Sequence, residues 1–236
     1  MNTLKRFLGQ EGAVTGATTG QLTVSILKRD GGQVAFDEGL EVTQLVMQEL
    51  SSIAASGFGI PRDNRGVHSH VQDVDALLLL HDNTKILGFA SALFPREGFL
   101  YLHGIVLSPE VKGKGGAGLL VRSLLSVCDC RDMAFSTQNP VMFCLLRSIC
   151  HAVYPSPEVN EVPEHFWPRL IKLLDGRSGI LDPKTGVRLN AYSQCLYPQI
   201  PESNDSSVNE WFSEKLMIED GKTNNGFLFI GEDLTR

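Results

Sequence analysis

Apolar residues follow two different spacings in the first half of this chain, and each spacing predicts a different kind of element. From Val42 onward they recur three or four positions apart, which is typical of a helix with one buried face, so we predict a helix over 38–55. Apolar runs bounded by turn residues predict strands at 21–27, 75–81, 85–94 and 99–107.

The last three of these strands follow one another closely and predict an antiparallel meander. Asp82–Thr84 and Pro95–Gly98 separate them with residues typical of tight turns. The segment before the meander, 57–70, contains Gly, Pro, Asn and Arg and predicts a loop.

After the meander, the chain predicts a helix opened by glycines over Gly116–Val127 and a short strand at Met133–Ser136. Asn139 as N-cap and Pro140 as first helical residue predict a further helix that ends near Cys150. Weaker patterns then predict a helix at 167–174, a strand at 188–196, a polar connector at 200–207 and a strand at 226–231.

The composition is ordinary for a globular protein, and its charge narrows the classes of partner. The 236 residues are 42% hydrophobic and 20% charged, with a formal net charge of −6. An acidic chain is a poor candidate for sequence-independent nucleic-acid binding, which needs a basic face. The longest apolar runs, such as Ala76–Leu80, are too short to span a bilayer, and Met1–Gln10 lacks the apolar core of a secretory signal. We expect no nucleic-acid or membrane partner.

Cysteine and histidine usage predicts a cytoplasmic protein without a metal centre. The five cysteines are odd in number and form no CxxC pair, so we expect reduced, mostly buried thiols. His68 and His70 stand two positions apart in the predicted loop without an evident third ligand, and we interpret them as solvated.

The segment from Ser108 to Leu120 carries the clearest chemical signal. Glycines at 113, 115, 116 and 118 allow tight turns and close approach of a ligand. The predicted helix that follows presents free N–H groups and the positive end of its dipole, which suits phosphate. Lys112 and Lys114 add positive charge to this loop.

The same glycines also satisfy a dinucleotide-binding motif. Gly113, Gly115 and Gly118 fit GxGxxG, so an NAD-dependent oxidoreductase is an alternative. Against it, Pro109–Lys112 separates the strand from the first glycine, and a meander precedes the loop where a dinucleotide site needs a strand–helix–strand unit. The pattern GxxxxGK[ST] of a P-loop is absent from the sequence.

The loop and its setting resemble the GNAT superfamily of N-acetyltransferases. Lys112–Ala117 follows the coenzyme A pattern Q/R-x-x-G-x-G/A, with Lys in place of Gln or Arg, and Leu107-Ser108-Pro109 is similar to the V-x-P that often precedes it. The resemblance covers roughly 75–150, with weaker support from Leu40 onward.

This resemblance implies acetyl-CoA as co-substrate and names the residues that hold it. The loop backbone would bind the pyrophosphate, the strand backbone at Ile105 and Leu107 would pair with pantetheine amides, and Asn139 would contact the cofactor. The implied loop residues are Lys112, Gly113, Lys114, Gly115, Gly116, Ala117 and Gly118.

Acyl transfer to an amine needs a base, and Tyr101 and His103 stand where arylalkylamine-type GNAT enzymes carry two histidines. Both residues lie on one face of the predicted strand. His103 ordinarily titrates near neutrality and is our candidate general base. The Tyr that many family members carry seven residues after the Asn is replaced by Leu146, so Cys144, Cys150 and Tyr154 remain alternative proton donors.

The sequence therefore predicts a mixed α/β GNAT fold, with a central, mostly antiparallel twisted sheet flanked by helices. We expect a flexible lead-in at 1–20, the acyl-CoA-binding domain at 21–155 and an extension at 156–236 packed on the same domain. The predicted activity is transfer of an acetyl or other short acyl group to a small-molecule or peptide amine by direct attack in a ternary complex. A non-catalytic acyl-CoA sensor is the first alternative.

We also propose roles in acceptor binding and in packing for two groups of residues outside the motif. Phe58 and 62–65 are candidates for the acceptor pocket. Trp167, Trp211 and Phe212 are candidate packing anchors of the extension, which completes the sheet, covers the acceptor cleft or forms a homodimer surface.

Overall fold

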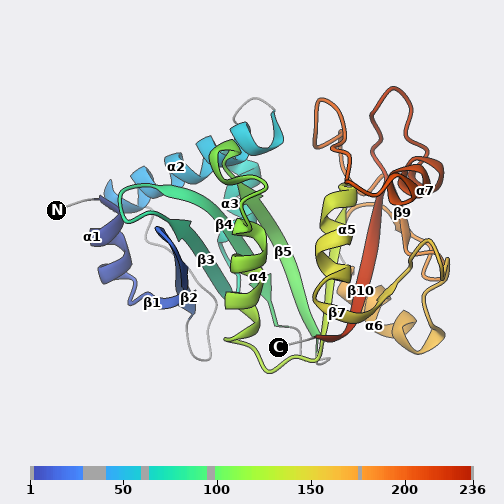
Figure 1. Ribbon diagram of the computed structural model, residues 1–236, viewed down its shortest axis with the longest axis horizontal. Helices are drawn as coiled ribbons and strands as arrows, with labels where there is room; N and C mark the ends of the chain where they lie inside the picture. Colours follow the sequence, from blue (N-terminus) through green and yellow to red (C-terminus); the bar gives the residue numbers. More distant parts are fainter. Residues whose placement is uncertain (1–2, 29–40, 60–63, 95–98, 175–176, 235–236) are drawn as a thin grey trace. The chain divides into compact units, whose positions relative to one another are not determined.

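The computed structural model of the protein describes residues 3–28, 41–59, 64–94, 99–174 and 177–234 (Figure 1). Contacts divide the chain into two compact units. The first unit comprises 1–94 and 102–129, and the second comprises 95–101 and 130–236, so strand β5 (Phe99–Leu107) contributes to both. Each unit is mixed α/β with mostly antiparallel strands flanked by helices, as the sequence predicts.

The sheet of the first unit has the strand order β1-β2-β3-β4-β5. Its first four strands are β1 (Val14–Thr19), β2 (Leu22–Lys28), β3 (Ala76–His81) and β4 (Ile86–Leu93). They pair antiparallel, with Val24 opposite Leu80 and Leu78 opposite Ala90. The predicted meander is therefore confirmed from β3 to β4, and β5 follows β4 in the sheet.

Side chains of β3 alternate between two layers of helices, because successive residues of a strand point to opposite faces. Leu77 and Leu79 join a buried cluster with α1 (Thr3–Gln10), α2 (Glu41–Phe58) and α3 (Asn64–Val71). Leu80 instead approaches Gly116 of α4 (Gly116–Leu125). The glycine loop therefore enters a helix that is packed directly on the sheet.

The second unit is built around the last strand of the chain. Strand β10 (Gly226–Leu234) pairs antiparallel with both β6 (Asp132–Thr137) and β7 (Cys150–Tyr154), and its first residues also pair with β9 (Val187–Leu189). The two-residue strand β8 (Ile180–Leu181) pairs with β9. Residues Phe99–Tyr101 of β5 form a short parallel ladder with β6.

An aromatic core joins the helices of the second unit to β10. Helices α5 (Pro140–Arg147) and α7 (Ser206–Leu216) contact each other, and α6 (Trp167–Leu173) follows a 3-10 turn at Glu164–Phe166. The core rings come from α5, α7 and β10: Phe143, Trp211, Phe212, Phe227 and Phe229. Trp211 stacks on Phe227 with ring centroids 4.5 Å apart. The predicted anchors Trp211 and Phe212 are thus buried in this core.

Three sequence predictions differ from this fold. Residues 64–71, predicted as part of a loop, form α3, and the predicted connector runs into α7, because tertiary packing stabilises both helices. The expected lead-in contains α1 and the strand β1, whose pairing with β2 supplies its hydrogen bonds.

Candidate functional site

Glycines shape the loop that the sequence predicts to bind phosphate. A 3-10 turn at Pro109–Val111, capped by Ser108, leads into it, and Gly113 and Gly115 have φ angles of 73° and 80°. These left-handed conformations favour glycine, because a side chain there costs backbone energy. A Cβ built on either residue would meet no described atom within 4 Å, so the loop surface is open at both.

Helix α4 begins at this loop and supplies its N–H groups. Its first intrahelical hydrogen bond runs from Leu119 N to Gly115 O at 3.0 Å, so the N–H groups of Gly116, Ala117 and Gly118 precede it. Arg122, one turn later, places its Nη1 3.2 Å from the position of a Cβ on Gly118. This cation was not predicted from the sequence, although its i+4 spacing from Gly118 was a readable signal. The combined geometry suits an anion.

The two lysines of the loop differ in their surroundings. The Nζ atom of Lys112 donates a hydrogen bond of 2.7 Å to the carbonyl of Gly57, in the last turn of α2. Lys112 therefore ties the loop to the negative end of that helix. Lys114 is exposed, and its backbone N–H donates to Val111 O at 3.2 Å. Lys114 is thus an exposed cation between the two open glycines.

The end of β5 is closely packed by glycines. A Cβ on Gly88 would lie 2.8 Å from the Val106 carbonyl oxygen, and one on Gly57 would lie 3.0 Å from that of Leu107. The proposed pantetheine-pairing residues Ile105 and Leu107 lie on β5 after the residues that form the ladder with β6.

His103 is half-buried on β5, and a second histidine contacts it. The ring centroids of His103 and His70 are 4.6 Å apart, with ring planes inclined by 49°. His70 lies on α3 and is exposed. The interpretation of His70 as a solvated loop residue is therefore wrong in one respect, because helix α3 brings its ring to β5.

In the second unit, Asn139 caps α5 and also reaches a tyrosine. Its Oδ1 accepts a hydrogen bond from Val141 N at 2.9 Å, and its Nδ2 donates to the hydroxyl of Tyr197 at 3.4 Å. The fully buried Gln138 accepts from Leu196 N at 3.0 Å and donates to the carbonyls of Thr223 and Asn225. Gln138 therefore holds the segment that carries Tyr197, a residue that was not predicted from the sequence.

The acetyltransferase (GNAT) family matches residues 47–139 of the chain. The matched segment includes the glycine loop and ends at Asn139. Residues 47–139 are a GNAT acetyltransferase domain. The resemblance stated from the loop and its setting is thereby confirmed for this segment.

Solved structures of acetyltransferases also match the chain at low identity. The ribosomal-protein-S18-alanine N-acetyltransferase of Escherichia coli is 13% identical, with 90% of this chain and 95% of that chain covered and a TM-score of 0.47. A GNAT family acetyltransferase of Elizabethkingia anophelis with acetyl-CoA bound is 15% identical, with 89% and 97% covered and a TM-score of 0.35. Among curated proteins, no relative matches the chain.

The proton-donor candidates named from the sequence lie in unlike surroundings. Burial raises the pKa of the Cys150 thiol to about 12, and Cys150 packs on Gly231 of β10. Tyr154 lies on β7, and β10 lies between β7 and β6 in the sheet. Burial, together with nearby Glu232, raises the pKa of the Tyr154 hydroxyl. Cys144 is partly exposed on α5. Only Cys150 of the five cysteines is buried, so the expectation of mostly buried thiols is wrong.

Tyr101, the partner predicted for His103, is buried in the second unit. The guanidinium of Arg177 lies 4.6 Å from the centroid of its ring, a cation–π contact. The Tyr101 hydroxyl also interacts electrostatically with that of Tyr192, and burial raises the pKa of the Tyr192 hydroxyl. These contacts favour a structural role for Tyr101.

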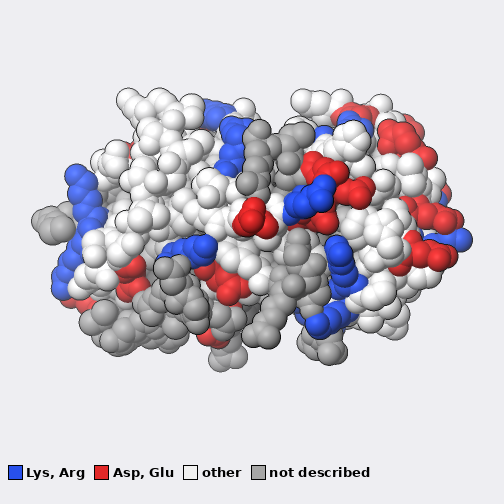
Figure 2. Space-filling model, turned by 90° about the horizontal axis from the view of Figure 1, so that it is seen from below, with Lys and Arg blue, Asp and Glu red and all other residues white. Residues whose placement is uncertain are grey.

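Several remaining features lie outside the predicted site. Within the described ranges, no group of three or more His, Cys, Asp or Glu side chains is placed to hold a metal ion, and no helix is long and apolar enough to cross a bilayer. Acidic and basic side chains are interspersed on the face shown in Figure 2. Of the acceptor-pocket candidates, Phe58 packs against the core of the first unit, while residues 62–63 lie outside the described ranges.

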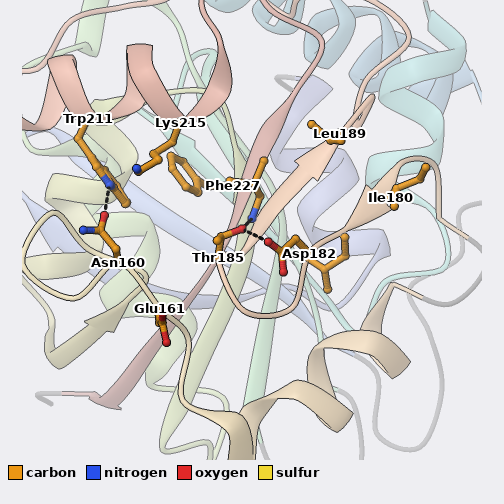
Figure 3. A pocket seen from close by; sticks show the side chains of 11 residues that line it. Asn160, Glu161, Ile180, Asp182, Thr185, Leu189, Trp211, Lys215 and Phe227 are labelled. Atoms are coloured by element: carbon orange, nitrogen blue, oxygen red, sulfur yellow. Dashed lines mark hydrogen bonds between the residues drawn. The ribbon is translucent and has the colours of Figure 1, made fainter.

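A cavity of about 440 Å³ opens in the second unit, between α7, the β8–β9 hairpin and the segment at Asn160 (Figure 3). Its wall includes Trp211 and Phe227, and Trp211 Nε1 donates to Asn160 Oδ1 at 2.9 Å. The predicted site residues do not line this cavity.

Proposed function

We propose that the protein is an N-acyltransferase that moves an acetyl or other short acyl group from acetyl-CoA to an amine acceptor by direct attack in a ternary complex. The amine nitrogen forms a bond to the acyl carbon, the carbon–sulfur bond breaks, and the amine loses a proton. The acceptor is a small-molecule or peptide amine.

The glycine loop is the observation that carries this proposal. Two left-handed glycines with open space above them lead into the N-terminus of α4, with Arg122 one turn away. Backbone N–H groups at a helix N-terminus bind phosphate without a metal. The family match over 47–139 supports a pyrophosphate of coenzyme A as the ligand.

His103 is the proposed general base of the reaction. It is half-buried on β5, four residues before Leu107, and an unperturbed imidazole titrates close to neutral pH. The backbone of Ile105 and Leu107 is proposed to pair with pantetheine, and Asn139 to contact the same co-substrate. A positioned base of this kind contributes roughly 10²- to 10⁴-fold to rate.

The first test replaces Gly115 with Leu and compares it with Gly20→Leu. Gly20 has a φ of 59° in the β1–β2 turn, and a Cβ added to it, like one added to Gly115, would meet no described atom within 4 Å. Both variants should therefore lose a similar stability of about 1–2 kcal/mol from left-handed strain. Only Gly115→Leu places a side chain over the proposed phosphate site.

Calorimetric titration with acetyl-CoA, coenzyme A and NAD decides the outcome. We expect wild type and Gly20→Leu to bind acetyl-CoA and Gly115→Leu to lose binding. Tighter binding of NAD than of acetyl-CoA would favour the oxidoreductase alternative, and equal binding by all three proteins would remove the loop from the site.

One observation supports the non-catalytic alternative. Leu146, which replaces the usual family tyrosine, is buried and packs against the position of Gly231 in β10. A protein that binds acetyl-CoA without turning over any amine in a broad screen would fit this alternative. Steady release of coenzyme A with any acceptor excludes it.

A further inference from the structure

Two imidazole rings meet in the first unit, and they come from segments 33 residues apart in sequence. His103 is half-buried on β5, and His70 is exposed on α3, with ring centroids 4.6 Å apart. Ring nitrogens at such a separation are within reach of proton exchange directly or through one water. The pair therefore joins a sheltered imidazole to one that faces solvent.

Gly104 and Ser91 shape the space beside the pair. A Cβ on Gly104 would lie 3.6 Å from His70 Nδ1 and 3.5 Å from Ser91 Oγ, so the glycine leaves both polar atoms facing one small space. The Ser91 hydroxyl is fully buried and has no hydrogen-bond partner among the described residues. A buried hydroxyl in this state indicates a polar occupant, since an unsatisfied one is costly.

We propose that His70 is a positioning residue that acts through His103, keeping His103 unprotonated before the reaction and passing its proton to solvent afterwards. The proposal rests on the proposed acyltransfer, in which His103 takes the proton of the attacking amine. After His103 takes the amine proton, His70 first releases its own proton to water and then accepts the proton of His103, so each imidazole returns to its starting state. The thiolate of coenzyme A is protonated separately.

Charge repulsion between the two imidazoles determines the direction of proton transfer within the pair. Two imidazolium cations this close repel each other, so protonation of one disfavours protonation of the other. Other titratable groups on elements packed around the pair are Arg65 and His68 on α3, and Glu41 and Glu49 on α2, while β4 contains none in its sequence. Glu49 already accepts a hydrogen bond from Ile86 N at 2.7 Å. The imidazole of His70 is a titratable group in ring contact with His103.

The test follows the ring resonances of His70 and His103 by NMR during a pH titration of the protein without ligand. We expect His70→Asn to raise the titration midpoint of His103 by about one pH unit, because a repelling neighbour is removed. His68→Asn, which removes a histidine of the same helix, should leave that midpoint in place. An unchanged His103 midpoint in His70→Asn would overturn the pairing.

Kinetics of the same variants separate this proposal from the acyltransfer itself. In His70→Ala, we expect the acidic limb of the kcat/KM profile to move upward, kcat to fall by up to about 10²-fold, and added imidazole to restore part of the rate. A methyl group on Gly104 fits at ordinary contact distances but fills the space between His70 and Ser91, so Gly104→Ala should also lower kcat. If wild type fails to bind acetyl-CoA, the proposed function and the relay both fall. If acetyl-CoA binds and turns over but the two titrations are independent, only the relay is wrong.

Discussion

At the scale of single residues, Leu146 stands where many GNAT enzymes carry a tyrosine, so the proposed acyl transfer needs a proton donor elsewhere in the chain. We propose Tyr197 as an alternative, because its hydroxyl lies 3.4 Å from Nδ2 of Asn139, the proposed co-substrate contact. Gln138, directly before Asn139, holds Leu196 and so fixes the approach of Tyr197. Burial raises the pKa of Tyr197 further above its ordinary value, so the hydroxyl carries its proton at neutral pH with or without this shift.

We therefore predict that Tyr197→Phe lowers kcat by about 10²-fold, the usual effect of removing one donor to developing negative charge. Acetyl-CoA binding by calorimetry should stay within a few-fold, because the loop is unaltered. Tyr192→Phe is the matched control, since it removes a hydroxyl from the same segment, and it should retain activity. An unchanged kcat in Tyr197→Phe would mean that solvent protonates the thiolate.

At the scale of elements, α7 shows how a helix with a weak sequence signal is stabilised by its ends. Asp205 is the N-cap, and its Oδ1 accepts from the N–H groups of Ser207 and Val208. Its Oδ2 accepts from Arg147 of α5 at 2.8 Å. The Arg147 hydrogen bond, followed by that of Ser207, lowers the pKa of Asp205 from 3.8 to about 2.

This shift predicts a dependence of stability on acid. Because the pKa of Asp205 is lower in the folded protein, its contribution is complete above about pH 4 and is lost as the pH falls toward 2. Asp205→Asn keeps a capping oxygen but loses the charge, whereas Asp205→Ala loses both. In urea titrations, the gap between wild type and Asp205→Asn should narrow across this range. Asp205→Ala should remain the least stable at neutral pH. Parallel curves for wild type and Asp205→Asn would contradict the assignment.

At the scale of the whole molecule, the two compact units have separate cores. Leu50 is fully buried in the first unit, and Phe229 is fully buried in the aromatic core of the second. Both tryptophans of the sequence, Trp167 and Trp211, belong to the second unit. Tryptophan fluorescence therefore reports on the second unit alone.

We predict that Phe229→Ala destabilises the second unit by about 3–5 kcal/mol and moves the fluorescence transition to lower urea. Leu50→Ala should cost about 2–5 kcal/mol in the first unit and shift far-UV circular dichroism more than fluorescence. Equal shifts of both signals in both variants would show instead that the units unfold as one.

Local pattern was sufficient for most elements and for the glycine loop. The period of α2, the turn residues around β4 and the Asn139–Pro140 start of α5 are each encoded within a few residues, so they could be predicted. Residue type allows the positive φ angles of Gly113 and Gly115 but does not fix them, since Gly116 and Gly118 of the same segment do not adopt positive φ. Helix α3 was missed because it lies in a polar segment that packing stabilises. Helix α7 was missed although Asp205 caps it and its buried residues Val208, Trp211 and Phe212 recur at helical spacing.

The sequence by itself determined the glycine loop, the strand that carries His103 and the capped helix that follows Asn139, because each depends on neighbouring residues. Only the tertiary structure decided which distant residues join them. It placed His70 against His103, Tyr197 against Asn139, and β10 between β6 and β7. These contacts span from 33 to more than 70 residues and depend on the packing of whole elements, which no local spacing records.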